Sequence, residues 1–276
     1  MDRYAVIGNP IQHSKSPLIH QAFAQASGQT LTYEKIEGPL GQFAATADRF
    51  RAEGGRGLNV TVPFKTDACA YATDLAESAR AAGAANALKF EGNRCLAQNF
   101  DGIGLVRDIV HNLGRPVQGQ RVLLLGAGGA TRGAILPLLA EQPARLFVAN
   151  RTVDKAVELA RFFHDQGAAS RVLEGGGYAD LSNDAFDIVI NATSASLSAD
   201  LPPLPITALK ADGLAYDMVY GKGLTPFLQL ARQAQVQHLA DGVGMLVEQA
   251  AEAFAWWRGV RPDTQSVIRQ LTVPLV

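Results

Sequence analysis

Short apolar runs alternate with amphipathic stretches along most of the chain. In the first hundred residues the apolar runs have the length of strands, and the stretches between them repeat apolar residues with a helical period. The pattern predicts strands at 3–8, 31–36, 58–62 and 87–90, and helices at 16–27, 40–52 and 75–82. Strands that alternate with helices are typical of an α/β protein with mainly parallel strands.

A longer amphipathic stretch, 102–114, follows this part of the chain and predicts a helix that ends at Gly114, shortly before Pro116. The continuous apolar run 121–125 then indicates a strand buried on both faces of a sheet. Later elements are predicted as strands at 146–149, 187–191 and 214–218, and as helices at 262–271 and from after Gly242-Val243-Gly244 to Trp257. We therefore predict two α/β lobes, the second a Rossmann-like doubly wound parallel sheet.

We place the first domain at residues 1–102 and the second at 103–242, with C-terminal helices from about 243–276 packing back onto the first domain. The 276 residues carry 25 Lys and Arg against 26 Asp and Glu, for a formal net charge of −1. This balance gives no general attraction to nucleic acid or to an anionic membrane.

The compartment and the metal content are inferred from what the sequence contains. No basic segment followed by an apolar one is found at the start, and no run reaches the ~20 apolar residues of a membrane span. Cys69 and Cys95 form neither a CxxC motif nor a metal-ligand spacing. We expect a cytoplasmic protein without a metal site.

The most informative local motif is RVLLLGAGGATRGA, residues 121–134. Gly126 ends the predicted strand, Gly128 permits close approach of the backbone, and Gly129 and Ala130 open a helix. Such a turn, Ala127 included, directs backbone N–H groups and the positive end of the helix toward a pyrophosphate. The third glycine of a full GxGxxG motif is absent, because that position holds Thr131.

The end of the next predicted strand indicates which dinucleotide binds. NAD sites usually carry an Asp or Glu there, but this chain has Asn150 followed by Arg151. A carboxylate would repel a 2′-phosphate, whereas Arg151 pairs with it through charge-assisted bonds. Thr152 is expected to cap the following helix and to donate its hydroxyl to the same phosphate, and Lys155 lies one helical turn beyond Arg151. We predict NADP as the cofactor.

Polar clusters in the first lobe suggest a substrate site. The segment His13–Pro17 is dense in hydroxyl groups, and Asn59 and Thr61 lie on one face of a predicted strand with Lys65 just beyond its end. Asn86 and Asp101 add an amide and a carboxylate. Each residue alone is more often turn chemistry, but together they offer a polar lining with one Lys and one Asp.

These motifs make the chain recognisable, because it resembles the shikimate dehydrogenase family from end to end. The matching stretches are GNPIQHSKSPLIH (8–20), NVTVPFK (59–65), GAANAL (83–88), NFDGIG (99–104), GAGGATRGA (126–134), NRT (150–152), INATS (190–194), YDMVY (216–220), TPFL (225–228) and DGVGMLVEQAA (241–251). The resemblance implies reversible NADPH-dependent reduction of 3-dehydroshikimate to shikimate, in chorismate and aromatic amino-acid biosynthesis. The implied protein is a monomer or homodimer.

The resemblance also implies roles for individual residues. Lys65 and Asp101 are expected to be the catalytic pair, although the sequence leaves open which of them is the formal proton donor. The substrate carboxylate is expected to bind Ser14, Ser16, Thr61 and Tyr220, and the ring hydroxyls to bind Asn59, Asn86, Asp101, Gln249 and Lys65. On the cofactor side the family places Thr193 and Ser194 near the ribose and diphosphate, and Met218 and Gly242 near the nicotinamide.

Two segments depart from the family pattern. Phe100 stands where the family commonly has Thr, and we expect it to point into the core. The segment Ala195–Ser198 lacks a glycine often found there, which predicts a local effect on the loop.

Two rival functions remain open at this point. One is a quinate/shikimate dehydrogenase of broad specificity, which typically favours NAD. The other is a non-catalytic NADP-binding sensor, which would have no reason to retain both Lys65 and Asp101.

Overall fold

The computed structural model describes residues 1–167, 171–182, 184–193, 202–221 and 223–275. The chain divides into two compact units. The first comprises Met1–Gly104 and Leu246–Gln270, and the second comprises Leu105–Met245 and Leu271–Val276. The C-terminal segment of the first unit therefore follows the whole main segment of the second in sequence.

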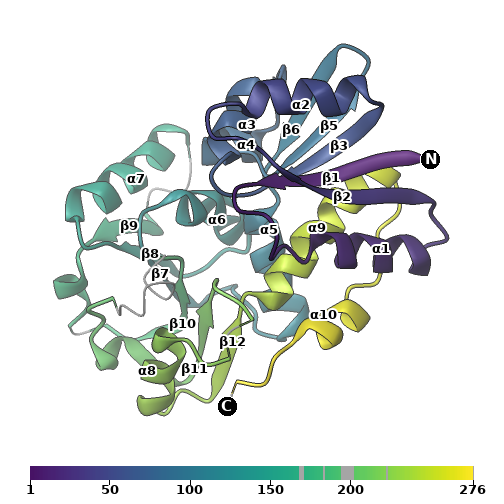
Figure 1. The fold of residues 1–276 in the computed structure, drawn as a ribbon. Coiled ribbons are helices and arrows are strands. Elements are labelled where there is room, and N and C mark those ends of the chain that lie inside the picture. The colour runs from purple at the N-terminus through teal and green to yellow at the C-terminus, as the bar shows by residue number, and fades with distance from the viewer. Residues whose placement is uncertain (168–170, 183, 194–201, 222, 276) are drawn as a thin grey trace. The chain divides into compact units, whose positions relative to one another are not determined.

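The first unit contains a sheet with the spatial order β2-β1-β3-β5-β6-β4 among the described residues (Figure 1). Its strands are β1 (Asp2–Gly8), β2 (Leu31–Glu37), β3 (Gly55–Val60), β4 (Asp74–Leu75), β5 (Ala87–Glu91) and β6 (Arg94–Gln98). Its helices are α1 (Ser16–Ala26), α2 (Phe43–Ala52), α3 (Lys65–Tyr71) and α4 (Glu77–Ala82), with the start of α5 (Asp101–Arg107) and most of α9 (Val243–Arg258) and α10 (Gln265–Leu271).

This sheet is mixed, so the expectation of mainly parallel strands holds for only part of it. β1 runs parallel to β2 and β3, and β4 parallel to β6, whereas β5 is antiparallel to both β3 and β6. A tight turn containing Gly92, with φ of 55°, joins β5 to β6. A turn this short can join only antiparallel strands, because a parallel pair needs a long crossover connection.

Alternation along β1 gives the sheet of the first unit two different faces. Ala5 and Ile7 pack into a cluster with α2 residues such as Phe50. Tyr4 and Val6 point the other way, into a cluster that contains Tyr33, Phe100, Ala253 and Trp257. We call this second cluster the aromatic face.

The second unit contains a fully parallel sheet with the order β12-β11-β10-β7-β8-β9 among the described residues. Its strands are β7 (Arg121–Leu125), β8 (Arg145–Ala149), β9 (Leu173–Gly176), β10 (Phe186–Asn191), β11 (Leu209–Asp217) and β12 (His238–Asp241). Its helices are α6 (Gly129–Ala140), α7 (Val153–Asp165) and α8 (Pro226–Gln233), with a π-helical segment at Asp108–Asn112 and 3-10 turns at Tyr178–Leu181 and Ile206–Ala208.

This strand order confirms the predicted doubly wound fold. The chain starts in the middle of the sheet at β7, builds outward to β9, then returns to β10 beside β7 and builds the other half. Leu123 and Leu125 of β7 are fully buried, as the apolar run predicted. In such sheets ligands bind at the carboxyl ends of the two strands where the order reverses, here β7 and β10.

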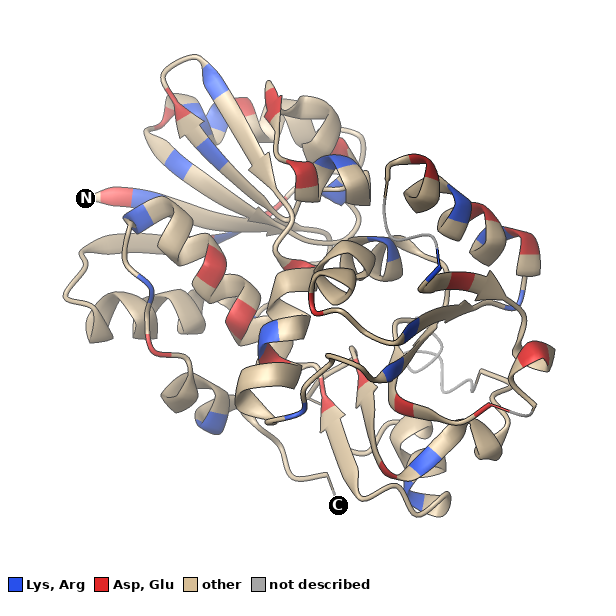
Figure 2. Cartoon of the chain, turned by 180° about the vertical axis from the view of Figure 1, so that it is seen from behind, with Lys and Arg blue, Asp and Glu red and all other residues tan. Residues whose placement is uncertain are grey.

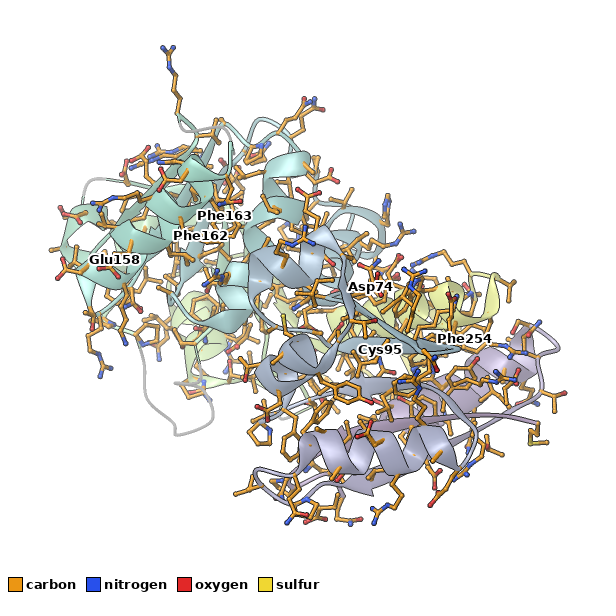
Figure 3. The ribbon with its side chains drawn as sticks, turned by 90° about the horizontal axis from the view of Figure 1, so that it is seen from above. Asp74, Cys95, Glu158, Phe162, Phe163 and Phe254 are labelled. Carbon is orange, nitrogen blue, oxygen red and sulfur yellow. The ribbon has the colours of Figure 1, made fainter. Side chains whose placement is uncertain are left out.

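Helix α7 illustrates how side chains cover this sheet. Phe162 and Phe163 are neighbours on α7, with ring planes at 88° and centroids 5.2 Å apart (Figure 3). Phe163 is fully buried, whereas Phe162 carries the Arg132 guanidinium 4.2 Å from its ring centroid. The outer side of the helix is charged, as its exposed Asp154, Lys155 and Glu158 indicate.

Several elements were not predicted from the sequence, namely α3, β4, β6, β9, α8 and β12. The predicted helix 102–114 is α5 continued by the π-helical segment, and Gly114 then adopts the left-handed conformation with φ of 63°. Basic and acidic positions are interspersed on the elements of both units (Figure 2). Within the described residues no helix combines the length and apolarity that a membrane span requires.

Candidate active site

Lys65 and Asp101 form an ion pair in the first unit, with Lys65 Nζ 2.6 Å from Asp101 Oδ2. Lys65 is the first residue of α3 and Asp101 is the first residue of α5. The two side chains are 30% and 17% exposed, so the pair is reachable from solvent yet largely shielded. The structure therefore brings the two predicted catalytic residues together.

Backbone contacts fix both members of this pair. The carbonyl of Lys65 accepts a hydrogen bond from Ala85 N at 2.8 Å, which ties the start of α3 to the segment before β5. The side chain of Asn99 receives the backbone N–H of Asp101 at 3.1 Å and donates to the carbonyl of Ala84 at 3.0 Å. Asn99 thus anchors the first turn of α5, which holds Asp101 in place.

Asn86 connects Asp101 to Gln249 through one amide group. Its Nδ2 donates to Asp101 Oδ1 at 2.8 Å and to Gln249 Oε1 at 3.2 Å, while its Oδ1 accepts from Phe100 N at 2.8 Å. Gln249 Nε2 in turn donates to the carbonyl of Leu246 at 2.8 Å. We call Lys65, Asn86, Asp101 and Gln249 the polar cluster.

A close approach of α5 to α9 gives Gln249 its position. A Cβ atom added at Gly104 would lie 2.8 Å from both the Cβ and the backbone N of Gln249, closer than real contacts allow. Glycine at this position therefore lets the two helices pack closely enough for Gln249 to reach Asn86. Both residues belong to the first unit.

The other predicted substrate residues of the first unit lie at the ends of β1 and β3. Ser14 Oγ donates to Ser16 Oγ at 3.2 Å, and Ser16 is buried at the start of α1. Thr61 follows β3, and its Cγ2 would lie 2.5 Å from a Cβ placed at Gly8, so glycine is needed there. Asn59 is a buried residue of β3, and its Nδ2 donates to the carbonyl of Asn86 at 3.3 Å.

Tyr220, also predicted for the substrate carboxylate, belongs to the second unit, on the loop after β11 that also carries Met218. Two carboxylates hold this loop. Asp217 accepts hydrogen bonds from Val219 N and Thr225 Oγ1, and Asp241 accepts from Gly221 N at 3.1 Å. Burial raises the pKa of Asp241. Sequence reasoning missed both carboxylates.

The predicted pyrophosphate turn connects β7 to α6 as expected. Gly126 has φ of 97°, a conformation that favours glycine, and Gly128 is the N-cap of α6. A Cβ at Gly128 or Gly129 would meet no atom of the described residues within 4 Å, so packing inside the protein does not account for these glycines. Ala130 is also exposed, and Ala127 is half-buried. The turn presents an open backbone surface at a helix N-terminus, which fits a dinucleotide phosphate.

Thr131 explains the departure from the GxGxxG pattern. It is fully buried, and its Oγ1 donates to the carbonyl of Gly126 at 2.7 Å. This bond holds the first turn of α6 against the end of β7. Thr131 is therefore part of the turn itself and leaves the fit to a phosphate intact.

The segment after β8 shows where the predicted 2′-phosphate residues lie. Asn150 Oδ1 accepts from Ala127 N at 3.2 Å and its Nδ2 donates to the carbonyl of Thr152 at 2.8 Å, so it links the two loops. Arg151, Thr152 and Lys155 are exposed. The prediction that the Thr152 side chain caps α7 is wrong. Thr152 occupies the N-cap position, but its side chain makes no capping bond there. The bond from Lys155 N goes to the backbone carbonyl of Thr152 instead.

The remaining cofactor predictions lie at the ends of β10 and β12. Thr193 donates through both N and Oγ1 to Asn191 Oδ1, and its Cγ2 would meet a Cβ at Gly126, so the carboxyl ends of β7 and β10 are adjacent. A Cβ at Gly242 would lie 2.2 Å from the carbonyl oxygen of Met218. Ser194 and the segment Ala195–Ser198 lie outside the described residues.

Phe100 points into the core, as predicted. It is buried in the aromatic face, and its ring meets Trp256 edge-on with centroids 5.8 Å apart. Trp257 stacks on Tyr4 and donates from Nε1 to the carbonyl of Leu88 at 3.0 Å, so the neighbouring tryptophan also belongs to the packing of this face. Among the described residues, no group of three or more His, Cys, Asp or Glu has the arrangement of a metal site.

A doubly wound sheet with a phosphate-binding turn, an arginine after its second strand, and a Lys–Asp pair in the other unit define a class of protein. This class is the NADP-dependent oxidoreductases. Comparison with known proteins gives the family. Residues 6–88 match the shikimate dehydrogenase substrate binding domain, residues 108–199 match shikimate / quinate 5-dehydrogenase, and residues 242–272 match the shikimate 5′-dehydrogenase C-terminal domain.

Individual relatives agree with these matches. The chain is 54% identical to shikimate dehydrogenase (NADP(+)) of Chromobacterium violaceum, over 98% of this chain and 97% of the relative. The crystal structure of an Ael1 enzyme from Pseudomonas putida superposes with a TM-score of 0.94 at 58% identity, covering 100% of both chains. Shikimate 5-dehydrogenase from Thermus thermophilus, in complex with NADP(H) and shikimate, superposes with a TM-score of 0.85 at 29% identity, covering 98% and 100%.

The chain belongs to the shikimate dehydrogenase family. Its activity is that of an NADP-dependent oxidoreductase of this family, and the names of its relatives support shikimate dehydrogenase over the broad-specificity alternative. The predictions of family, doubly wound fold and cofactor are confirmed. The roles of individual residues stay predictions.

Proposed function

We propose that Lys65 and Asp101 are the catalytic pair with which this chain interconverts 3-dehydroshikimate and shikimate. The observation that carries the proposal is the 2.6 Å contact between Lys65 Nζ and Asp101 Oδ2, within a cluster that Asn86 and Gln249 complete. An ordinary surface ion pair contributes at most about 1 kcal/mol and needs no such surrounding network.

The chemistry of the reaction requires this kind of pair. NADPH supplies the hydride when it is bound. The ketone oxygen gains negative charge during reduction, so a positive group and a proton must stand beside it. The Lys65 ammonium provides the positive field, and the Lys65–Asp101 pair holds the proton. Asp101 keeps the ammonium in place, and Asn86 keeps Asp101 in place.

The substrate is recognised by uncharged hydrogen-bond partners as well as by this pair. We assign the carboxylate to Ser14, Ser16, Thr61 and Tyr220, because several hydroxyl donors together can satisfy one anion. We assign the ring hydroxyls to Asn59, Asn86 and Gln249, with Lys65 and Asp101. A site of this kind rejects analogues that lack a hydroxyl, because its buried polar groups would be left unpaired.

The cofactor assignment follows the second unit. The backbone of the turn, Gly126, Ala127, Gly128, Gly129 and Ala130, suits the pyrophosphate, with Thr193 and Ser194 beside the diphosphate and ribose. Asn150, Arg151, Thr152 and Lys155 suit the phosphorylated ribose, and Met218 and Gly242 the nicotinamide. The exposed guanidinium of Arg151 is free to pair with a phosphate in a bidentate manner.

The biological setting follows from the reaction. We assign the chain to chorismate and aromatic amino-acid biosynthesis in the cytoplasm, acting as a monomer or homodimer. We assign substrate binding and catalysis to residues 1–102 with the C-terminal helices, and NADP binding to residues 103–242.

A spectrophotometric assay tests the proposal. Shikimate and quinate are each oxidised with NADP and with NAD, and kcat/KM should be highest for shikimate with NADP. Comparable values for quinate would favour the broad-specificity rival, and cofactor binding without turnover would favour the non-catalytic sensor. Lys65→Ala should lower kcat about 10²–10⁴-fold, as loss of a general acid does.

A matched control is Lys89→Ala. Lys89 also forms an ion pair in the first unit, with Glu91 Oε1 at 2.8 Å, and has similar exposure. This variant should keep the kcat of the unmodified protein. Wild-type kcat in Lys65→Ala would refute the assignment of the catalytic pair.

A further inference from the structure

The aromatic face of the first unit contains one short polar connection between β2 and β3. Tyr33 on β2 is buried, and its hydroxyl donates to Asn59 Oδ1 on β3 at 2.7 Å. Tyr33 lies level with Tyr4 of β1, and Asn59 lies level with Val6 of the same strand. The Tyr33 side chain therefore reaches across β1 to meet Asn59.

His20 on α1 holds the ring of Tyr33. The two rings stack with centroids 4.2 Å apart and planes at 8°. Phe23 of the same helix and Phe254 and Trp257 of α9 surround His20, each with its ring centroid within 6.1 Å (Figure 3 labels Phe254). Burial lowers the pKa of His20 to about 3, against a smaller opposing effect of the Asn59 side chain, so His20 is neutral at physiological pH.

Two hydrogen bonds hold the Asn59 amide in one orientation. Its Nδ2 donates to the carbonyl of Asn86 at 3.3 Å, and because a carbonyl can only accept, the nitrogen must face it. Oδ1 then faces the Tyr33 hydroxyl, which donates to it at 2.7 Å and holds the amide from the other side. The bond to Asn86 uses one of the two Nδ2 hydrogens.

We propose that Tyr33 is a positioning residue for substrate recognition, which acts by fixing the side-chain amide of Asn59. The inference rests on the proposed function, because it requires that Asn59 contacts a ring hydroxyl of the substrate. Tyr33 itself touches no reacting atom. It is the middle member of a stack and hydrogen bond that run from α1 through β2 to β3.

A neighbouring contact supports this placement. Burial raises the pKa of Tyr33 well above its ordinary value, and the Ser16 hydroxyl partly opposes that effect. The Tyr33 hydroxyl thus stays protonated, and able to donate, at neutral pH. It also lies beside Ser16, a residue assigned to the substrate carboxylate, so it adjoins two parts of the proposed substrate site.

Steady-state kinetics of Tyr33→Phe test the proposal. This change keeps the ring and its stacking on His20 and removes only the hydroxyl. KM for shikimate should rise about tenfold with saturating NADP, while kcat and the KM for NADP should stay within about twofold. The ratio of kcat/KM for shikimate to kcat/KM for an analogue that lacks one ring hydroxyl should also fall. This fall is expected only for the analogue that lacks the hydroxyl bound by Asn59.

The matched control is Tyr71→Phe. Tyr71 also donates its hydroxyl to a side-chain oxygen in the first unit, Asp48 Oδ1 at 2.6 Å, but it belongs to the other face of the sheet. This variant should keep the KM of the unmodified protein. Both KM and the ratio between two substrates are independent of the fraction of folded enzyme, so a partly unfolded variant still gives an answer.

A double-mutant cycle separates positioning from a general structural role. In an Asn59→Ala background, Tyr33→Phe should change the KM for shikimate by less than about twofold, because its target is gone. An unchanged KM in Tyr33→Phe alone, or a tenfold effect that persists without Asn59, would overturn the inference. A different result would show that the proposed function is wrong, namely an unchanged kcat in Lys65→Ala.

Discussion

In the first unit, Lys65, Asn86, Asp101 and Gln249 hold one another through side-chain hydrogen bonds. In the second unit, Gly128, Gly129 and Arg151, which we assign to the cofactor, are exposed. The first region is organised by protein contacts before any ligand binds. The second offers backbone N–H groups and charged side chains that a phosphate would organise. A substitution in the first region should therefore disturb its neighbours, and one in the second should act mainly on its own contact.

Of the changes that compare the two regions, the largest effect should come from breaking the polar cluster at its carboxylate. Asp101→Asn keeps the size of the side chain but removes the charge that faces the Lys65 ammonium. We expect kcat to fall about 10²–10³-fold, because both the position and the charge of the donor change. Initial rates with saturating shikimate and NADP measure this. Asp74→Asn, which alters an exposed ion pair with Arg94 in the same unit, is the control and should leave kcat unchanged.

In the second unit the corresponding test is Arg151→Ala. The KM for NADP should rise about 10–100-fold, the value of one charge-assisted phosphate contact of 1.5–3 kcal/mol, while kcat changes little. The KM for NAD, which has no 2′-phosphate, should stay nearly constant. Arg161→Ala, an exposed arginine farther along α7, should change neither. A parallel rise in both KM values for Arg151→Ala would show that it does not read the 2′-phosphate.

Buried His20, which packs behind the polar residues of the first unit, should make the free energy of unfolding depend on pH. His20 has a pKa of about 3 in the folded protein, below its ordinary value of 6.5. Between these two pH values the histidine is protonated in the unfolded chain but neutral in the folded one. The free energy of unfolding should fall by about 1.4 kcal/mol per pH unit below pH 6.5, hence by about 2 kcal/mol at pH 5. Urea unfolding of the protein and of His20→Phe at pH 7 and 5 measures this. The variant should lack this part of the slope, and equal slopes would contradict the expectation.

The smallest effect concerns Thr131, which organises the glycine turn. Thr131→Val removes the bond to the Gly126 carbonyl and should cost about 1 kcal/mol, or a few degrees in Tm. Thr46→Val removes a similar bond, from Thr46 Oγ1 to the carbonyl of Gln42 at 2.9 Å, in the first unit. Both variants should lose similar stability in thermal unfolding. Only Thr131→Val should also raise the KM for NADP. If both variants have the same KM for NADP, the turn held by Thr131 does not contribute to cofactor binding.

Hydrophobic patterning predicted four strands of each sheet and missed β4 and β6 in the first unit and β9 and β12 in the second. The runs 122–125 and 188–190 are continuous and apolar, because strands in the middle of a parallel sheet are buried on both faces. β6 has the sequence RCLAQ, in which the buried residues are the small Cys95 and Ala97, so no strong apolar signal marks it. β4 has only two residues and gives no periodicity at all.

Motifs predicted residues at the ends of strands but could not show what holds them. The Lys65–Asp101 pair was expected from the motifs in which both residues lie. The bond between Asn86 and Gln249 joins residues 163 positions apart, and the Tyr33–Asn59 bond crosses an intervening strand. Contacts of this kind depend on register and helix packing, which one sequence does not reveal. The missing cap of Thr152 is similar, because residue type alone does not determine side-chain direction.

The pairing of Asn86 with Gln249 has a consequence for the order of events during protein synthesis. The ribosome delivers the entire parallel sheet of the second unit before it delivers α9. Until then the aromatic face lacks Ala253 and Trp257, and the amide of Asn86 lacks one of its acceptors. The N-terminal segment of the nascent chain therefore stays incompletely covered until α9 has been synthesised.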